Sequence, residues 1–282
     1  MTDLAPLSTL YDAASGDEVP LPIELAALYG SLRFPASATR PYVIGNFVTT
    51  LDGVVSLNVP GQAGGGEISG FNQHDRMVMG LLRAVADAVI VGAGTLRASP
   101  QHLWIAETTY RPLAEVYRML HSDLGKTEPP LNVIVTAHGD LDLRLPVFHT
   151  ESIPVLIVTT SDGARHLRKQ SLPNRLQVAI VEGAEQVSAR SILAAVARAR
   201  RCEVILTEGG PRLIGDFFAE KCLDELFLTL APQIAGRDDL IERPGLVAGK
   251  TFAPDHALWG KLASIKRGGD HLFLRYTFES TS

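Results

Sequence analysis

Residues 81–100, LLRAVADAVIVGAGTLRASP, combine three features that together decide the fold. The opening residues complete a helical pattern whose apolar positions are 78, 81, 82 and 85. A continuous apolar run, DAVIVG, follows and ends in glycine, which is typical of a strand buried on both faces. The glycine-rich turn GAGT comes directly after this strand. The stretch therefore predicts a helix, a buried strand and a ligand-binding turn in succession.

The strand pattern recurs along the chain and alternates with helical patterns. Strands are predicted at YVIGNFVTTL (42–51), NVIVT (132–136), PVLIVTT (154–160), EVILTEGG (203–210) and LDELFLTLAPQI (223–234). Helices are predicted after Asn72, after Ser188 and at PRLIGDFFAEK, where Pro211 takes the first helical position. This alternation predicts the α/β class, with a mostly parallel central sheet flanked by helices.

Both ends of the chain depart from the alternation. KLASIKRGGDHLFLRYTF (261–278) predicts an antiparallel C-terminal hairpin, turned at RGGD, that adds edge strands to the sheet. Residues 1–40 are irregular apart from a short helical pattern, and we interpret them as an N-terminal extension. Residues 41–282 are predicted to form a single domain, in which the poorly patterned residues 104–130 form a flexible insertion.

The composition excludes several classes of protein. Apolar residues make up 46% of the 282 residues and charged residues 20%, as is ordinary for a soluble globular protein. A net charge of −5 without a basic run argues against nucleic acid as a partner, and no apolar stretch is long enough to span a membrane. The N-terminus lacks the basic segment of a secretory signal, so the predicted location is cytoplasmic. Cys202 and Cys222 are expected to be buried thiols, and the eight histidines lack metal-binding spacing, so no metal is expected.

Two glycine-rich turns follow buried strands, VGAGT at 91–95 and TEGGP at 207–211. Ligands of parallel α/β sheets bind at the carboxyl ends of the strands, where glycine lets the backbone approach a pyrophosphate and a helix N-terminus attracts its charge. Glycine also often simply ends a strand, so a plain turn remains an alternative. Neither turn has the G-x-G-x-x-G fingerprint, which disfavours an ordinary Rossmann domain but not a dinucleotide.

Three charged residues near these turns are candidates for an active site. Glu208 stands at a strand end beside the second glycine pair, and Asp52 belongs to the LDG turn. Each is either an active-site acid or an ordinary loop residue, since Asp-Gly is a common turn signal. Arg83, in the last turn of its helix, is placed either to pair with Asp87 or to meet a substrate phosphate.

Taken in order, NFVTTLDG (46–53), LLRAVADAVIVGAGTLRASP (81–100) and VILTEGGPRLIGDF (204–217) resemble the reductase domain of riboflavin biosynthesis, the pyrimidine reductase family with a dihydrofolate-reductase-like fold. The resemblance implies NADPH as hydride donor and a small-molecule substrate. The implied reaction reduces the ribosylamino side chain of an aminopyrimidine phosphate of the 5-amino-6-ribosylaminouracil 5′-phosphate type. It also implies a stand-alone form, because the H-x-E and P-C-x-x-C zinc motifs of the fused deaminase are missing from this sequence.

The resemblance further implies roles for particular residues. The implied cofactor contacts are Val48, Thr49, Gly92, Gly94, Thr95, Ser99, Thr136, Gly209, Gly210, Arg212, Leu213, Ile214 and Gly215. The implied substrate contacts are Thr50, Glu67, Arg83 and Glu208, with Asp52 and Glu208 as catalytic residues. The ring-opened ribosylamine is an imine, and a nearby carboxylic acid or a water chain would assist by protonating the imine nitrogen while hydride adds to the adjoining carbon.

One segment departs from the family pattern. GGGEISGFNQHD (64–75) replaces a Ser-x-Trp-Ile-Thr-like segment, with Glu67 and Ser69 where the serine and tryptophan would fall. This change keeps two alternatives open: a reductase of another heterocycle, such as dihydrofolate or a dihydropterin, and a catalytically silent nucleotide-binding protein. The presence of Glu208 and Asp52 argues against the silent protein.

The C-terminal hairpin also suggests an assembly. Its second strand, DHLFLRYTF, has a strong tendency to form β-structure and would promote aggregation if its edge were bare. We therefore predict a homodimer that covers this edge.

Overall fold

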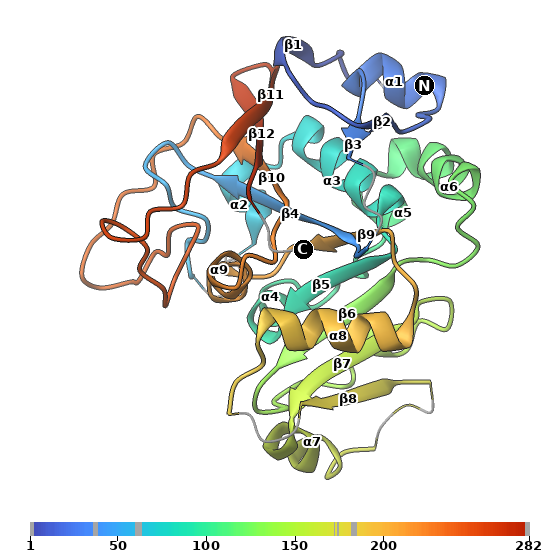
Figure 1. Cartoon of the computed structure of the whole chain (residues 1–282), viewed down its shortest axis with the longest axis vertical. Coiled ribbons are helices and arrows are strands. Elements are labelled where there is room, and N and C mark those ends of the chain that lie inside the picture. The colour runs from blue at the N-terminus through green and yellow to red at the C-terminus, as the bar shows by residue number, and fades with distance from the viewer. Residues whose placement is uncertain are drawn as a thin grey trace.

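The computed structural model describes residues 3–35, 39–59, 64–171, 173, 175–181 and 185–279. Its centre is a ten-stranded sheet in the order β1-β11-β12-β10-β4-β9-β5-β6-β7-β8 (Figure 1). These strands are β1 (Ser8–Asp12), β4 (Tyr42–Thr49), β5 (Ala88–Gly92), β6 (Leu131–Thr136), β7 (Val155–Thr160), β8 (Gln177–Val181), β9 (Val204–Thr207), β10 (Glu225–Leu230), β11 (Lys261–Gly268) and β12 (His271–Thr277). A small separate sheet pairs β2 (Asp17–Glu18) with β3 (Arg33–Phe34).

Helices cover both faces of the large sheet (Figure 1). The helices are α1 (Ile23–Tyr29), α2 (Gly65–Ser69), α3 (Gln73–Val85), α4 (Ala93–Ala98), α5 (Ala106–Thr109), α6 (Ala114–Asp123), α7 (Ser161–Leu167), α8 (Ala189–Ala199) and α9 (Pro211–Ala219), with 3₁₀ turns η1 (Arg111–Leu113) and η2 (Pro146–Phe148). One core contains side chains of α1, α3, α5 and α6, and a second core contains those of α8 and α9. None of the helices formed by the described residues has the length and apolarity to traverse a bilayer.

The strand DAVIVG shows why the chain adopts this layered form. Along β5, Val89 and Val91 belong to the first core, whereas Ala88 and Ile90 belong to the second. Both faces are apolar because both are covered, as expected of a central parallel strand. All neighbouring strands from β10 to β8 pair in parallel, and β12, β11 and β1 add antiparallel pairs. The predicted α/β class, mostly parallel sheet and C-terminal hairpin are therefore confirmed.

The hairpin is not at the edge of the sheet, however, so that expectation is wrong. β1 pairs antiparallel with β11, from Ser8 opposite Arg267 to Asp12 opposite Ser264, and covers the outer hairpin strand. A buried cation strengthens this attachment. Lys266 is 2% exposed, donates to Thr9 Oγ1 at 3.1 Å and lies 4.8 Å above the ring of Tyr29. The outer edge of the hairpin is thus covered by a segment of the same chain, and β1 becomes the outermost strand.

The expectation of a flexible insertion at residues 104–130 is also wrong. Much of the segment forms α5, η1 and α6, and Trp104, Tyr117 and Leu120 are buried in the first core. Tyr117 lies against α3, where its hydroxyl donates to the carbonyl of Met77 at 3.0 Å. Its ring occupies the space above Gly80, since a Cβ built on Gly80 would stand 2.5 Å from Tyr117 Cζ.

Gly80→Ala is therefore expected to destabilise the protein, although alanine is the better helix former. The overlap with a buried ring costs about 1–3 kcal/mol, offset by about 1 kcal/mol of helix propensity. Chemical denaturation of the single variant should show a net loss, and the same substitution should cost less when it is made in a Tyr117→Leu background. A Gly80→Ala protein at least as stable as wild type would contradict the packing described.

Candidate functional site

The candidate site lies at the carboxyl ends of β4, β9, β5 and β10. The ends of β9 and β5 are level, because the N–H of Glu208 donates to the carbonyl of Ile90 at 2.9 Å. The two glycine-rich turns that follow these strands consequently lie side by side. A Cβ built on Gly210 would stand 3.6 Å from Thr95 Oγ1, and one on Gly92 would stand 4.0 Å from Leu213 Cδ2. The structure therefore brings together two turns that are more than a hundred residues apart in sequence.

Glycine is required at one position of this pair of turns. A Cβ on Gly209 would lie 2.4 Å from Leu213 Cδ2 and 3.1 Å from Leu213 Cβ, whereas one on Gly94 would meet nothing within 4 Å. Gly210 is the N-cap of α9, and Pro211 takes the first helical position as predicted. The amide groups at this helix start are suited to an anion.

The first turn of α9 divides its residues between solvent and core. Arg212 is exposed, while Leu213 is 8% and Ile214 0% exposed. A Cβ on Gly215 would meet Val247 Cγ1 at 3.2 Å, so this glycine lies beneath a neighbouring loop. The N–H of Ile214 is used within the helix, where it donates to the carbonyl of Gly210. Of these four residues, Arg212 is the one with an exposed side chain.

The remaining cofactor and substrate candidates lie around this centre. Val48 and Thr49 end β4, with side chains 9% and 7% exposed, and Thr50 follows with none exposed. Ser99 and Glu67 both lie beside Gly64, since a Cβ on Gly64 would stand 3.7 Å from Ser99 Oγ and 3.2 Å from Glu67 Oε2.

Thr136 lies further along the sheet, at the end of β6. Its hydroxyl accepts the N–H of Gly139 at 3.0 Å and so shapes the loop that follows. The carboxyl ends of β5 and β6 are neighbours in the sheet.

Glu208 forms a buried ion pair with Arg83. Arg83 donates from its Nη2 to Glu208 Oε2 at 2.6 Å and from Nε to the same oxygen at 3.1 Å. The two side chains are 2% and 8% exposed. Asn46 adds a hydrogen bond to Glu208 Oε1 at 3.3 Å, and Arg83 also donates to Thr109 Oγ1 at 2.8 Å. The pair joins α3, β4, α5 and the loop after β9 at one point.

The alternative pairing of Arg83 with Asp87 is wrong. The Asp87 carboxylate instead accepts from Lys126 and from the N–H groups of Glu203 and Val204, the latter two at 2.8 and 2.9 Å. Asp87 therefore connects the beginnings of β5 and β9. Its role in the RAVADA segment is structural.

Asp52 fastens the loop after β4 to the loop after β10. Its carboxylate accepts from the hydroxyl of Thr50 at 2.5 Å and from the N–H groups of Ala235 and Gly236 at 3.1 and 2.8 Å. The hydrogen bond from Thr50 and those from these two amides lower the pKa of Asp52 to about 2. Its carboxyl is thus an ionised acceptor at neutral pH.

The hydrogen bonds of Asp52 predict how the amide groups of Ala235 and Gly236 respond to acid. The lowered pKa means that the contact is intact above the ordinary carboxyl pKa and is lost as pH falls through about 2. We expect the Gly236 amide resonance to stay constant from pH 7 down to pH ~3, where an ordinary aspartate is largely protonated. A titration midpoint near pH ~4 would contradict this arrangement. Asp52→Asn provides the non-titrating control.

Three residues that the sequence did not single out also lie near the Glu208–Arg83 pair. Asp75, in the first turn of α3, is only 5% exposed, and its pKa is influenced by Glu208. Burial, with smaller effects from the Arg83 and Arg76 charges, lowers the pKa of His102 to about 4. Arg76 is exposed and lies 5.6 Å above the Phe71 ring. Two arginines and a neutral histidine make this side of the site suitable for an anion.

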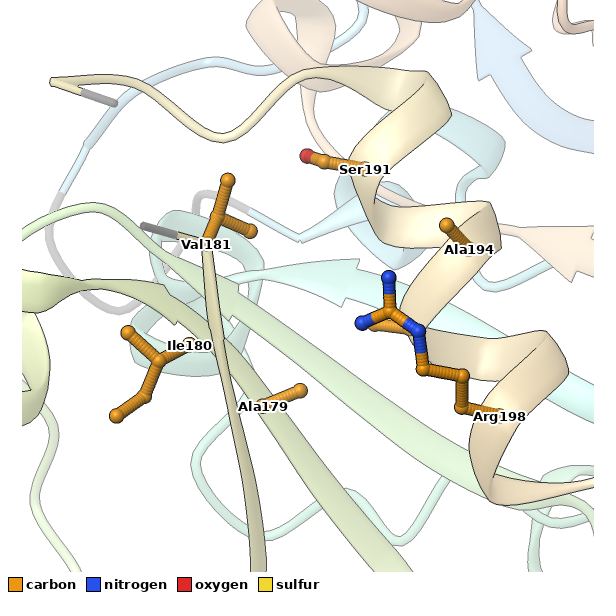
Figure 2. A pocket seen from close by; sticks show the side chains of 7 residues that line it. Ala179, Ile180, Val181, Ser191, Ala194 and Arg198 are labelled. Atoms are coloured by element: carbon orange, nitrogen blue, oxygen red, sulfur yellow. The ribbon is translucent and has the colours of Figure 1, made fainter. Parts of the chain in front are cut away.

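A separate hollow of about 430 Å³ lies between β8 and α8. Figure 2 shows Arg198 extending from α8 toward the side chains of Ala179 and Val181. The strands β5, β6 and β7 separate β8 from β9 in the sheet, so this hollow is remote from Glu208. It is lined by alanine and aliphatic side chains with Ser191 and Arg198, and it contains none of the candidate residues.

Comparison with known proteins agrees with this arrangement. The family of the RibD C-terminal domain matches residues 41–272. The 2,5-diamino-6-ribosylamino-4(3H)-pyrimidinone 5′-phosphate reductase of Archaeoglobus fulgidus is 28% identical over 217 residues, which cover 76% of this chain and 89% of that protein. The riboflavin biosynthesis protein RibD of Aquifex aeolicus is 25% identical over 201 residues, covering 70% of this chain and 48% of RibD.

A solved structure gives the same fold at low sequence identity. The pyrimidine reductase-like protein of Corynebacterium diphtheriae superimposes with a TM-score of 0.67 at 19% identity, covering 91% of this chain and 99% of that one. The family match extends over most of the sheet, from β4 into β12, and includes both glycine-rich turns and Glu208. The chain belongs to the RibD C-terminal domain family.

Proposed function

We propose that this protein is an NADPH-dependent reductase that converts the ribosylamino side chain of an aminopyrimidine phosphate to a ribityl chain in riboflavin biosynthesis. The observation that carries the proposal is the position of the buried Glu208–Arg83 pair directly before the Gly209-Gly210 turn. A polar, hydrogen-bonding group thereby adjoins a turn suited to a pyrophosphate. The name of the relative from Archaeoglobus fulgidus, a pyrimidinone 5′-phosphate reductase, supports the reaction, and the name of the relative from Aquifex aeolicus supports a place in riboflavin biosynthesis.

The residues present fit a nicotinamide dinucleotide. A Cβ built on Gly94 would meet nothing within 4 Å, and one built on Gly210 would meet only Thr95 Oγ1 at 3.6 Å, so the backbone of both turns is open to a ligand and Gly210 and Thr95 form the floor between them. We assign the pyrophosphate to this floor and to the amides at the start of α9, with Arg212 as the exposed cation beside it. NADPH, when bound, supplies the hydride for the reaction.

The remaining cofactor candidates keep their assigned places in this proposal. The ends of β4, β5 and β6 would hold the rest of the dinucleotide through Val48, Thr49, Gly92, Gly94, Ser99 and Thr136, and the buried Leu213, Ile214 and Gly215 would fix the first turn of α9.

The substrate is assigned to the space between Glu208 and the α2 segment. Glu208 would accept hydrogen bonds from ribose hydroxyls, and Arg83 would hold that carboxylate in place. Arg83 and Arg76 would provide the positive charge for the substrate phosphate, with the neutral His102 nearby. Thr50 and Asp52 would fix the loop beneath the substrate, and Glu67 would approach it from α2.

The experiment that tests this function is oxidation of NADPH in the presence of 5-amino-6-ribosylaminouracil 5′-phosphate, with NADH and dihydrofolate in parallel. Rapid oxidation of NADPH with the pyrimidine, and slower reaction in both comparisons, would support the proposal. Turnover of dihydrofolate in place of the pyrimidine would instead assign the protein to a heterocycle reductase. Binding of NADPH with no turnover of either compound would favour a silent nucleotide-binding protein.

We further propose that the protein acts as a cytoplasmic homodimer. The hairpin edge is covered by β1, but β1 itself is the outermost strand, and its Leu10 and Tyr11 are 56% and 45% exposed. Pairing with a second copy at this strand would cover both the free strand edge and these apolar side chains. Light scattering at micromolar concentration should give the mass of a dimer, and a monomer would overturn the assignment.

A further inference from the structure

Reduction of an imine requires a proton as well as a hydride, and three carboxyl groups lie near the candidate site. Asp52 already accepts three hydrogen bonds and has a pKa of about 2, so it holds no proton at neutral pH. Glu208 is bound as a carboxylate by the guanidinium of Arg83 and accepts a further hydrogen bond from Asn46. Neither group is suited to give a proton to a substrate.

The third carboxyl, Asp75, has a different environment. It lies in the first turn of α3, is 5% exposed and accepts hydrogen bonds from the side chains of Thr229 and Ser69. Thr229 stands opposite Val48 in the β10–β4 ladder, at the ends of strands that carry the candidate site. Asp75 is therefore held over the same edge of the sheet as Glu208, with α2 on one side and β10 on the other.

The groups around Asp75 do not neutralise it. Glu208 faces it from the loop after β9, and His271 faces it from β12. Asn72 Nδ2 lies 3.1 Å from His271 Nδ1, and His271 Nε2 lies 3.0 Å from the carbonyl of Ser69. Because an amide nitrogen can only donate, His271 Nδ1 is the acceptor and Nε2 carries the hydrogen, which describes a neutral ring. Within the described ranges, Asp75 forms no ion pair with a lysine or arginine.

These surroundings favour the neutral acid. Burial raises the pKa of Asp75, and the charge of Glu208 acts in the same direction. The hydrogen bonds from Thr229 and Ser69 oppose that rise, and a positive charge on His271 would oppose it too, but the neutral ring described above carries none. A buried carboxyl next to a charged carboxylate is the usual arrangement by which one acid stays protonated while its neighbour is ionised.

We propose that Asp75 is the proton donor of the reaction, an inference that rests on the proposed function. Hydride adds to the imine carbon, and the C=N π electron pair takes the proton from the Asp75 carboxyl to form the N–H bond. The substrate becomes a secondary amine, and the dinucleotide leaves oxidised. Asp75 remains as a carboxylate and regains its proton from water.

The protonation state of Asp75 can be tested without turnover. We expect the infrared difference spectrum of wild type minus Asp75→Asn to show the carbonyl band of a protonated carboxyl at pH ~7, whereas an ordinary aspartate is ionised there. Asp123→Asn, at an exposed acid that ends α6, serves as the matched control and should show carboxylate bands only. A difference spectrum with only carboxylate bands for Asp75 would overturn the proposal whatever the substrate.

The pH dependence of turnover tests the role itself. Wild-type kcat should fall as pH rises through the pKa of Asp75, and Asp75→Asn should lower kcat about 10²–10⁴-fold and remove this fall. Asp75→Glu should restore part of the activity, and KM should change little. An Asp75→Asn enzyme with wild-type kcat and an unchanged pH profile would overturn the proposal while leaving the proposed function intact. A wild type that shows the protonated band but no turnover of the pyrimidine would count against the proposed function alone.

Stability provides a further readout that a merely structural role would not produce. Because the pKa of Asp75 is raised in the folded protein, its contribution to stability is present below the unfolded-state pKa and is lost as pH rises through the folded-state pKa. Asp75→Asn should therefore be at least as stable as wild type at pH ~8. A large loss of stability there would assign Asp75 a structural role and contradict the inference.

Discussion

Glu208→Gln is expected to lose both stability and turnover. The substitution leaves the guanidinium of Arg83, which is 2% exposed, facing a neutral amide. Removal of one member of a buried ion pair costs about 3–5 kcal/mol, because the remaining charge stays desolvated. Turnover falls as well, since the carboxylate is the group we assign to the substrate. Chemical denaturation measures the loss of stability. The rate of NADPH oxidation at saturating NADPH and substrate measures the loss of turnover.

A second buried pair provides the matched control for Glu208→Gln. Arg275 and Glu225 are 4% and 1% exposed, are joined at 2.7 Å and connect β12 to β10. Glu225→Gln should therefore cost a similar free energy of unfolding, while the folded protein keeps its turnover. If both variants lost stability and activity in the same proportion, the effect of Glu208 would be structural. Wild-type stability and turnover in Glu208→Gln would contradict the site described.

Gly209→Ala is expected to weaken both the fold and the binding of NADPH. Its Cβ would overlap the side chain of Leu213 and would also crowd Leu213 Cβ. Because the position of Cβ does not depend on the rotamer, a change of the Leu213 rotamer alone cannot relieve this crowding. The first turn of α9 must shift, at a cost of about 1–3 kcal/mol. If a similar energy is lost from cofactor binding, Kd rises about 5- to 150-fold. Isothermal calorimetry with NADPH and chemical denaturation give the two values.

Gly210→Ala separates the two effects, because its Cβ would make only an ordinary contact with Thr95 Oγ1 at 3.6 Å. The fold should remain within about 1 kcal/mol of wild type, the cost of alanine at an N-cap. Binding of NADPH should still weaken, since the methyl group stands where the pyrophosphate is placed. If both variants bound NADPH with wild-type affinity, the assignment of the cofactor to this turn would be contradicted.

Much of the sheet could be predicted because its strands are buried on both faces. Runs such as DAVIVG and PVLIVTT consist mainly of apolar residues, which predicts burial on both faces, and each of them forms a strand. β1 could not be predicted in this way, since all five of its residues are exposed and its pairing with β11 relies on main-chain hydrogen bonds. The segment with α5 and α6 lacked a clear pattern, although Trp104 is buried and Tyr117 is buried against α3.

In the candidate site, too, features that depend on neighbouring residues could be predicted, whereas contacts between distant residues could not. Glu208 and the glycines were identifiable because the turn, the strand end and the helix start are adjacent in sequence. The partner of Arg83 was not, because Asp87 is four residues away whereas Glu208 is 125 residues away. Asp75 could not be identified from the sequence, because an acid in the first turn of a helix is ordinary, and only its burial near Thr229 and Ser69 distinguishes it.

The pairing of β1 with β11 has a consequence for how the protein is made. Ser8 pairs with Arg267, so β1 is synthesised 259 residues before the partner with which it pairs (267 − 8). At about 5–20 residues per second, that interval lasts on the order of 10–50 s. Until then, β10 presents an open edge, because β12 is its antiparallel neighbour. A ribosome that stops before residue 261 would release a chain whose unfinished sheet can pair with other chains, and quality control of such products would fall to chaperones.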